Sequence, residues 1–199
     1  MAKIRPIPRE EATPEQQRVG DAIFGSRNED YGGPSAVLLH VPEMAQRFED
    51  LRAALIGDER LPRPALHFAA LLAARFWSSQ YTWWKRVEMC RAAGIPDDVI
   101  DAVRDRRRPA AFADPVLEVV YDYVAELLET GRVGEGTDAR ALQLLGEQEL
   151  IQLVLIVGFY SMLALVSDAF EPELPSGVVP PLEEPGGSGE GRLRERSDP

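Results

Sequence analysis

Apolar side chains recur at helical spacing along most of this chain, and no segment alternates apolar and polar residues in the manner of a strand. Leu38, Met44, Phe48, Leu51 and Leu55 show the helical spacing clearly. The pattern predicts about eight helices. Two of them begin at Pro14 and at Pro96, and the other six cover residues 35–56, 64–77, 79–93, 115–130, 137–146 and 147–170. The helix over 35–56 is either continuous or broken before Pro42. We therefore expect an all-α, compact helical bundle.

Several helix ends carry recognisable capping residues. Thr13, Pro14 and Gln16 form a capping-box pattern with proline at the first helical position. Asp114 precedes Pro115 in the same way, and Ser79 is placed to cap the helix over 79–93. These signals predict where the chain changes direction.

The chain has 199 residues, which suits one domain with short extensions. Residues 1–12 are charged and contain proline, so we expect an extended N-terminal arm. Residues 13–175 form the helical domain. Residues 176–199 are expected to be a flexible C-terminal tail, because the segment from 183 onward is rich in glycine, proline and charge.

Composition narrows the possible partners. The formal net charge of -11 argues against nucleic acid, whose phosphates need clustered cations. One cysteine, Cys90, excludes an intramolecular disulfide and a cysteine-based zinc site, and two histidines leave little for a metal centre. We therefore expect neither a metal nor another cofactor. The N-terminal residues show no apolar core of signal-peptide length, which favours a cytoplasmic protein.

One strongly apolar segment needs a separate interpretation. Residues 153–166 are apolar apart from Ser161, but this stretch of 14 residues is shorter than the ~20 that a membrane-spanning helix needs. We expect a core or subunit-interface helix and no membrane insertion. Because the helix over 149–170 carries more apolar surface than one domain needs to bury, we also expect a homo-oligomer.

The densest group of unusual residues lies at 75–86, which holds all three tryptophans, Tyr81, two arginines and a lysine. On a helix over 79–93, Ser79, Thr82, Arg86 and Cys90 fall at steps of three, four and four, so they share one face. Ser79 and Thr82 lie near the positive end of the helix dipole, which favours an anion there.

At these residues the chain resembles a known family. Residues 66–75 (LHFAALLAAR), 79–86 (SQYTWWKR) and 93–96 (AGIP) are similar to the core motif of the carboxymuconolactone decarboxylase family, which includes alkylhydroperoxidase-D-like proteins. The flanking segments 39–44 (LHVPEM), 112–115 (FADP) and 158–160 (GFY) agree with it. The resemblance covers roughly residues 5–175, and it implies an all-α fold and homo-oligomers, commonly trimers or hexamers.

The resemblance does not extend to the family's peroxidase residues. That branch carries Cys-x-x-Cys-x-x-x-His and an earlier Glu, which fall here on Ser79, Thr82, Arg86 and His67, and none matches. The branch without cysteines often has Tyr-Glu-Trp-x-x-His. Tyr81 and Trp83 match that pattern, while Thr82 and Arg86 depart from it. The chain is therefore nearer to the branch without the cysteine pair.

Cofactor-free acid–base chemistry on a small carboxylate or lactone is the leading functional hypothesis. Decarboxylation requires a group that holds the carboxylate and groups that stabilise and protonate the resulting carbanion. Arg86 could hold the carboxylate, His67 could act as the acid, and Tyr81 could donate a hydrogen bond to an oxyanion. The predicted catalytic residues are therefore His67, Tyr81 and Arg86, and the predicted ligand-binding residues are Ser79, Thr82 and Trp83, with Trp84 as a further wall.

Two other hypotheses stay open at this point. The chain could be a non-catalytic member that binds a small anion or serves as an assembly subunit, because the polar motif positions are replaced. It could also reduce hydroperoxides through Cys90, which requires an exposed thiol of lowered pKa. The alternative for Cys90 is a buried, inert thiol, which we favour.

Overall fold

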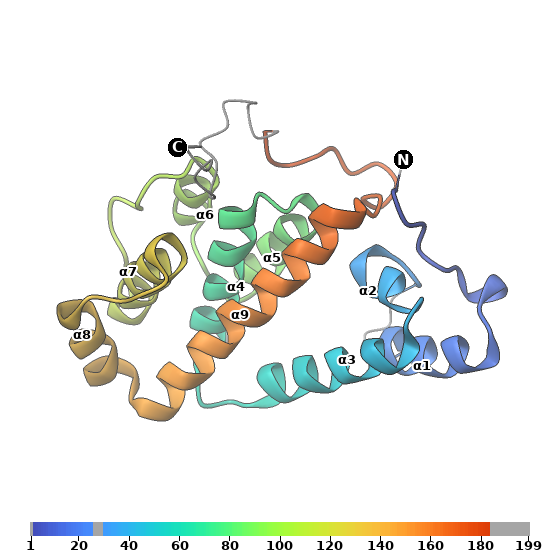
Figure 1. Ribbon diagram of the computed structural model, residues 1–199. Helices are drawn as coiled ribbons and strands as arrows, with labels where there is room; N and C mark the ends of the chain where they lie inside the picture. Colours follow the sequence, from blue (N-terminus) through green and yellow to red (C-terminus); the bar gives the residue numbers. More distant parts are fainter. Residues whose placement is uncertain (1, 26–29, 184–199) are drawn as a thin grey trace, which may run out of the picture.

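The structure is a computed structural model that describes residues 2–25 and 30–183 of the chain. These residues form nine α-helices and one short 3-10 helix at Arg9–Glu11, and they contain no strand (Figure 1). The helices are α1 (Pro14–Gly25), α2 (Gly33–Leu38), α3 (Pro42–Gly57), α4 (Arg63–Trp77), α5 (Gln80–Ala92), α6 (Asp97–Arg104), α7 (Pro115–Thr130), α8 (Glu135–Leu145) and α9 (Glu147–Phe170). The all-α prediction is confirmed, and the ninth helix arises because the chain breaks before Pro42.

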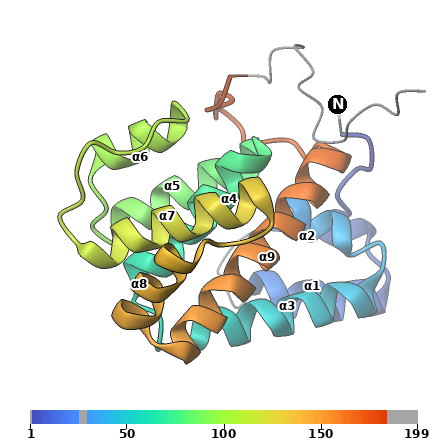
Figure 2. The same cartoon turned by 60° about the vertical axis from the view of Figure 1, so that its left-hand side comes forward.

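Helix α4 is the centre of the main core. Its residues from Ala65 to Ala74 are all buried, because α5, α7 and α9 pack around it (Figure 2). Five of these ten residues are alanines, which let neighbouring helices approach closely. A second, smaller apolar cluster joins α1, α2 and α3. The functional residues discussed below lie where these two clusters meet.

Two of the predicted helix starts are confirmed by hydrogen bonds. The Gln16 backbone N–H donates to Thr13 Oγ1 at 3.3 Å, and the Thr13 N–H donates to Gln16 Oε1 at 2.9 Å. The Val116 N–H donates to Asp114 Oδ1 at 2.8 Å. Ser79 stands at the start of α5, but its side chain makes no capping bond, because its hydroxyl donates to another side chain.

Gln152 fastens α9 to the segment that joins α3 to α4. Its amide is buried, accepts a hydrogen bond from the Leu61 N–H at 2.9 Å, and donates to the carbonyl oxygens of Leu55 at 3.0 Å and Asp58 at 3.1 Å. Three backbone groups are thereby satisfied by one side chain. This contact fixes the relative positions of α3, α4 and α9.

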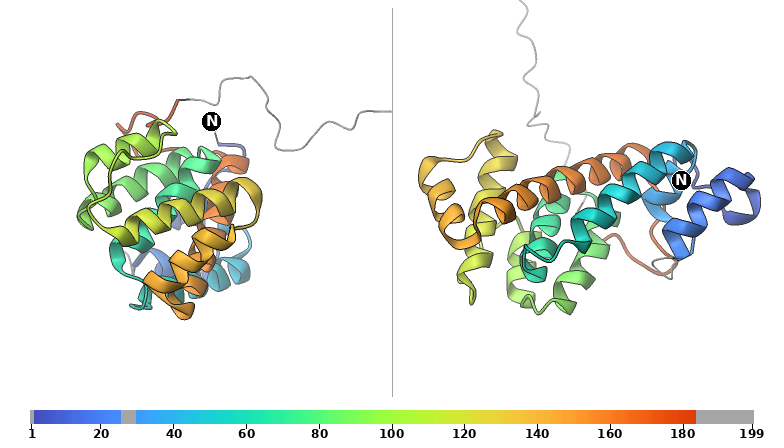
Figure 3. Two further views of the ribbon diagram at one scale, coloured as in Figure 1. Left: turned by 90° about the vertical axis from the view of Figure 1, so that its left-hand side faces the viewer. Right: turned by 90° about the horizontal axis from the view of Figure 1, so that it is seen from below.

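Helix α9 runs along most of the molecule, from the α7–α8 end to the α2 end (Figure 3). It is long and apolar enough to cross a membrane by length and composition, but half of its most apolar window is buried against the other helices. Such burial is typical of a core helix. The opposite side of α9 is exposed and is considered further below.

The first and last segments that the structure describes pack on the helical domain. The Lys3 N–H donates to the Phe170 carbonyl at 3.0 Å, so the N-terminal arm reaches the end of α9. After α9 the chain returns along residues 171–183, and Leu182 is buried there. The Gln80 side chain donates to the Leu182 carbonyl at 2.8 Å and accepts from its N–H at 2.9 Å. The first part of the predicted tail therefore lies against α5, and residues 184–199 fall outside the described part.

Candidate active site

A cavity of about 720 Å³ lies between α2, α3, α4, α5 and α9, and the segment after α9 borders it. Its wall draws on residues from Phe24 to Pro175, so most of the chain contributes to it. Its charged, polar and aromatic lining includes Arg52, Arg63, His67, Tyr81, Thr82, Trp84, Lys85, Arg86, Tyr160 and Glu173. All three predicted catalytic residues, His67, Tyr81 and Arg86, thus line one cavity.

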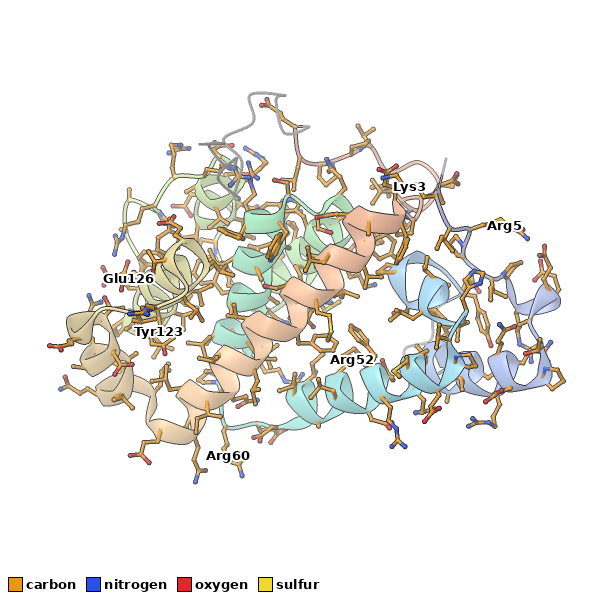
Figure 4. The ribbon with its side chains drawn as sticks, viewed as in Figure 1. Lys3, Arg5, Arg52, Arg60, Tyr123 and Glu126 are labelled. Atoms are coloured by element: carbon orange, nitrogen blue, oxygen red, sulfur yellow. The ribbon has the colours of Figure 1, made fainter. Side chains whose placement is uncertain are left out.

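The charge at the cavity differs from that of the whole chain. Four cationic side chains line it, against two carboxylates: Arg52, Arg63, Lys85 and Arg86 against Asp30 and Glu173. Arg52 lies on the side of α3 that faces α9 (Figure 4). It donates to the buried Glu49 carboxylate at 2.6 and 2.8 Å. A cationic surface in a chain of net charge -11 is selective for an anion.

His67 is the most unusual side chain of the cavity. It is 9% exposed, and its Nδ1 atom is buried with no hydrogen-bond partner among the described residues. Burial, with smaller contributions from the positive charges of Arg86 and Arg63, lowers the pKa of His67 to about 4. The imidazole is therefore neutral at pH 7. An unsatisfied buried nitrogen costs free energy, which a ligand hydrogen bond can recover.

Arg86 is held by Tyr160 on α9. Its Nη1 donates to the Tyr160 hydroxyl at 3.1 Å, and its Cζ lies 4.9 Å from the centre of the Tyr160 ring. Tyr160 is almost completely buried, so this support is rigid. Among the described residues we find no carboxylate paired with Arg86. Its remaining donors are therefore available to an anion in the cavity.

Two aromatic side chains of α5 form a wall of the cavity. Tyr81 and Trp84 meet edge to face with their ring centres 5.7 Å apart, and Lys85 Nζ lies 5.6 Å from the Trp84 ring centre. Tyr81 packs against Gly33, where a Cβ atom would lie only 2.2 Å from Tyr81 Cζ. Gly33 also has a φ of +58°, so glycine is required there on two grounds. The aromatic wall suits a flat ligand.

The predicted ligand-binding residues have different locations. Thr82 lines the cavity, whereas Ser79 and Trp83 are buried and lie outside the residues that line it. The Ser79 hydroxyl donates to Thr82 Oγ1 at 3.1 Å, and Thr82 Oγ1 lies 3.5 Å from Ser167 Oγ on α9. These hydroxyls therefore connect α5 with α9. Ser79 and Trp83 do not border the cavity, so neither is placed to contact a ligand there.

Cys90 is buried, as expected for an inert thiol. It is fully covered, and its Sγ donates to the His67 carbonyl oxygen at 3.4 Å. Burial raises the pKa of Cys90 to about 12, although the charge of Arg86 opposes this effect. A thiol of that pKa is protonated at neutral pH and is a poor nucleophile. The geometry therefore lacks the exposed thiolate that hydroperoxide reduction requires.

Sequence reasoning did not identify Arg52, Arg63 or Tyr160 as site residues. Arg63 carried a detectable signal, because a cation in the first turn of a helix opposes the helix dipole. Tyr160 carried a weaker signal, since its hydroxyl is a polar group within a long apolar segment. Arg52 carried no signal, because an arginine three residues after a glutamate, here Glu49, is an ordinary charge pair of a helix surface. Within 2–25 and 30–183, no group of three or more His, Cys, Asp or Glu is arranged to hold a metal ion.

Comparison with known proteins gives evidence on the fold. Models of known protein families do not match this chain, and curated proteins do not match it either. The chain is similar in fold to a debrominase. The solved structure is a cysteine-to-alanine variant of the debrominase Bmp8 in complex with 2,3,4-tribromopyrrole. It matches with a TM-score of 0.66 at 11% identity, over 87% of this chain and 91% of that one. At this identity the similarity shows that this chain shares the helical fold of Bmp8, and it supports no finer conclusion.

Proposed function

We propose that this protein is an enzyme that catalyses a cofactor-free proton-transfer reaction on a small, flat carboxylate or lactone. The observation that carries the proposal is the state of His67 in the cavity. Its imidazole is neutral at pH 7, its buried Nδ1 atom has no hydrogen-bond partner among the described residues, and the positive charges of Arg86 and Arg63 add to the effect of burial in lowering its pKa. Isomerase and lyase steps that begin with removal of a carbon-bound proton require a neutral base of this kind. The proposal retains His67, Tyr81 and Arg86 as catalytic residues.

Ligand binding follows from the charges and aromatic groups of the cavity. A substrate carboxylate accepts hydrogen bonds from Arg86, and Arg63 adds a second positive charge nearby. The flat part of the substrate lies against Tyr81 and Trp84. The structural neighbour Bmp8 is described in complex with 2,3,4-tribromopyrrole, a small flat ring, which supports a ligand of this size and shape.

The state of His67 favours one order of events. A neutral imidazole accepts a proton from the carbon next to a carboxylate or a lactone carbonyl, and the electron pair moves onto the carbonyl oxygen. Arg86 and the Tyr81 hydroxyl stabilise this enolate. Return of the proton to another carbon completes an isomerisation, whereas cleavage of a neighbouring bond completes a lyase step. His67 thus begins as a base, which differs from the role of acid that its ordinary pKa suggested.

Solvent deuterium exchange tests this proposal without knowledge of the natural substrate. The purified protein is incubated in D₂O with a panel of small unsaturated carboxylates and carboxylated lactones, and exchange of the carbon-bound proton is followed by NMR. We expect exchange with native protein and its loss in His67→Gln and Arg86→Ala. Arg47→Ala, an exposed arginine of α3 outside the cavity wall, is the matched control and should exchange normally.

A non-catalytic role remains as the second candidate, because Thr82 and Arg86 replace polar residues of the motif that the chain resembles. Such a protein would bind a small carboxylate in the same cavity without exchanging its protons. Saturable binding of benzoate by native protein and loss of binding in Arg86→Ala, with no exchange for any compound of the panel, would favour this role over catalysis.

A further inference from the structure

The outer side of α9 carries an uninterrupted apolar stripe. Ile151, Leu155, Met162 and Leu165 are between 42% and 62% exposed, and Gly158 is exposed midway between them. The steps between these five positions are four, three, four and three residues, which keeps them on one face of a helix. No charged residue occurs between Leu150 and Ser167. We refer to Ile151, Leu155, Gly158, Met162 and Leu165 as the α9 stripe.

Among the residues that the structure describes, nothing requires glycine at position 158. A Cβ atom placed on Gly158 would meet none of their atoms within 4 Å, and its φ is not positive. Alanine would therefore fit and would stabilise the helix, since glycine in a helix interior is unfavourable. Glycine is commonly found where another backbone approaches closely. The position of Gly158 at the centre of an exposed apolar stripe indicates that a second helix crosses α9 there.

The sequence of the stripe is self-complementary about Gly158. If two copies of α9 lie antiparallel and cross at this residue, Ile151 of one copy lies opposite Leu165 of the other, and Leu155 lies near Met162. Each contact then occurs twice, as a twofold axis requires. We infer that α9 pairs in this antiparallel way with the α9 of a second copy of this chain.

Charge placement favours the antiparallel orientation over the parallel one. Glu147 and Glu149 lie in the first turn of α9, so parallel helices would set these carboxylates against their own copies. In the antiparallel pair the two Glu147 residues are ~33 Å apart along the axis, at ~1.5 Å per residue. Each Glu147 instead reaches the end of the other α9, where Lys3 offsets the charge of Glu171 at 2.7 Å and Asp168 is the remaining acid, so the repulsion is weaker than between two copies of Glu147 and Glu149. In Figure 4, Lys3 lies near the end of α9 and Arg60 lies near its beginning.

A membrane or an unrelated partner suits the stripe less well. Half of the most apolar window of α9 is already buried in the fold, so the helix cannot enter a bilayer without unfolding its own core. The net charge of -11 also repels an anionic membrane surface. The same net charge makes two copies of the chain repel each other at most of their surfaces. This repulsion is weakest at the α9 stripe, because the stripe carries no charge. This inference is independent of the proposed function.

Disulfide trapping tests the geometry. Two helices ~10 Å apart leave ~5 Å between facing Cα atoms, which is within the range that a disulfide spans. We therefore expect Gly158→Cys to form a covalent dimer on mild oxidation. Ile151→Cys should not, since its two copies would be ~21 Å apart along the axis. The native chain is the control, because its Cys90 thiol is fully buried.

Sedimentation velocity at micromolar concentration tests the association itself. We expect native protein and Leu144→Glu, a matched change on α8, to sediment as two copies of 22.1 kDa or an even multiple. Leu155→Glu should weaken self-association at least tenfold and retain the helical circular dichroism of the native protein. A native monomer, an odd number of copies, or efficient linking of Ile151→Cys to itself would overturn the proposal. Loss of association in Leu144→Glu but not in Leu155→Glu would overturn it as well.

Discussion

Trp83 and Trp84 are consecutive in the chain, yet they lie in different environments. Trp83 is 2% exposed within the main core, whereas Trp84 borders the cavity and meets Tyr81 edge to face. Neighbouring residues of a helix point about 100° apart, so α5 can present one tryptophan to the core and the next to a ligand. This difference separates a structural residue from a candidate binding residue.

The two tryptophans should therefore respond differently to truncation. We expect Trp83→Ala to lower the free energy of unfolding by about 3–5 kcal/mol, because it leaves a large cavity in the core. Trp84→Ala should change stability much less and weaken binding of benzoate severalfold. Urea denaturation and isothermal titration calorimetry measure the two effects. Equal losses of stability in both variants would show that Trp84 is also a core residue.

The lowered pKa of His67 predicts a pH dependence of stability. Its folded-state pKa of about 4 lies below the ordinary histidine pKa of 6.5, so the unfolded chain binds more protons between these values. The stabilisation is complete above about pH 6.5 and is lost as the pH falls toward 4, by up to ~3 kcal/mol. Denaturant unfolding from pH 4 to 7 should show this slope in native protein and a shallower one in His67→Leu. Parallel curves for the two proteins would contradict the assignment.

The hydrogen bond between Arg86 and Tyr160 should support anion binding. Tyr160→Phe keeps the ring beneath the guanidinium but removes the hydroxyl that accepts from Arg86. A hydrogen bond of this kind contributes ~0.5–1.5 kcal/mol, so we expect benzoate to bind roughly threefold to tenfold more weakly. Tyr123→Phe, a change at a buried tyrosine of α7 outside the cavity wall, is the matched control. Unchanged affinity in Tyr160→Phe would remove Tyr160 from the site.

Gln152 should be among the least replaceable polar residues. Gln152→Leu leaves the Leu61 N–H and the carbonyls of Leu55 and Asp58 without the partner they now share. Buried unsatisfied groups cost ~1–3 kcal/mol each, so we expect a loss of at least ~2 kcal/mol in the free energy of unfolding. Gln143→Leu, at an exposed position of α8, should have little effect. Thermal and urea unfolding of both variants provide the comparison.

The clamp between Gln80 and Leu182 predicts protease resistance of the segment after α9. Gln80→Ala removes both hydrogen bonds to the Leu182 backbone, which contribute ~1–2 kcal/mol together. Cleavage within 171–183 should then become about tenfold faster in limited proteolysis. Leu182→Ser should act similarly through loss of burial. If the native protein is cleaved there as rapidly as the variants, the clamp does not hold the segment.

Helix positions could be predicted from sequence because they depend on local chemistry. Thr13 with Gln16 and Asp114 with Val116 make the expected capping bonds within a few residues of each other. The break at Pro42 is local as well. Such signals depend on neighbouring residues alone, so no knowledge of the tertiary fold is needed to recognise them.

The membership of the cavity could be predicted only in part. His67, Tyr81 and Arg86 were identified from their residue types and from the family resemblance, and they do line one cavity. The orientations of Ser79, Trp83 and Trp84 could not be predicted, because α5 has apolar residues on more than one face. Arg63 and Tyr160 come from other helices, and only the packing of α4, α5 and α9 brings them together.

The location of the segment after α9 has a consequence for ligand binding. Glu173 and Pro175 contribute to the cavity wall, and the contact between Gln80 and Leu182 anchors their segment to α5. A molecule in which this segment is detached therefore has an incomplete cavity. A ligand that binds only the complete cavity would accordingly hold the segment in place, by an amount that grows with ligand concentration.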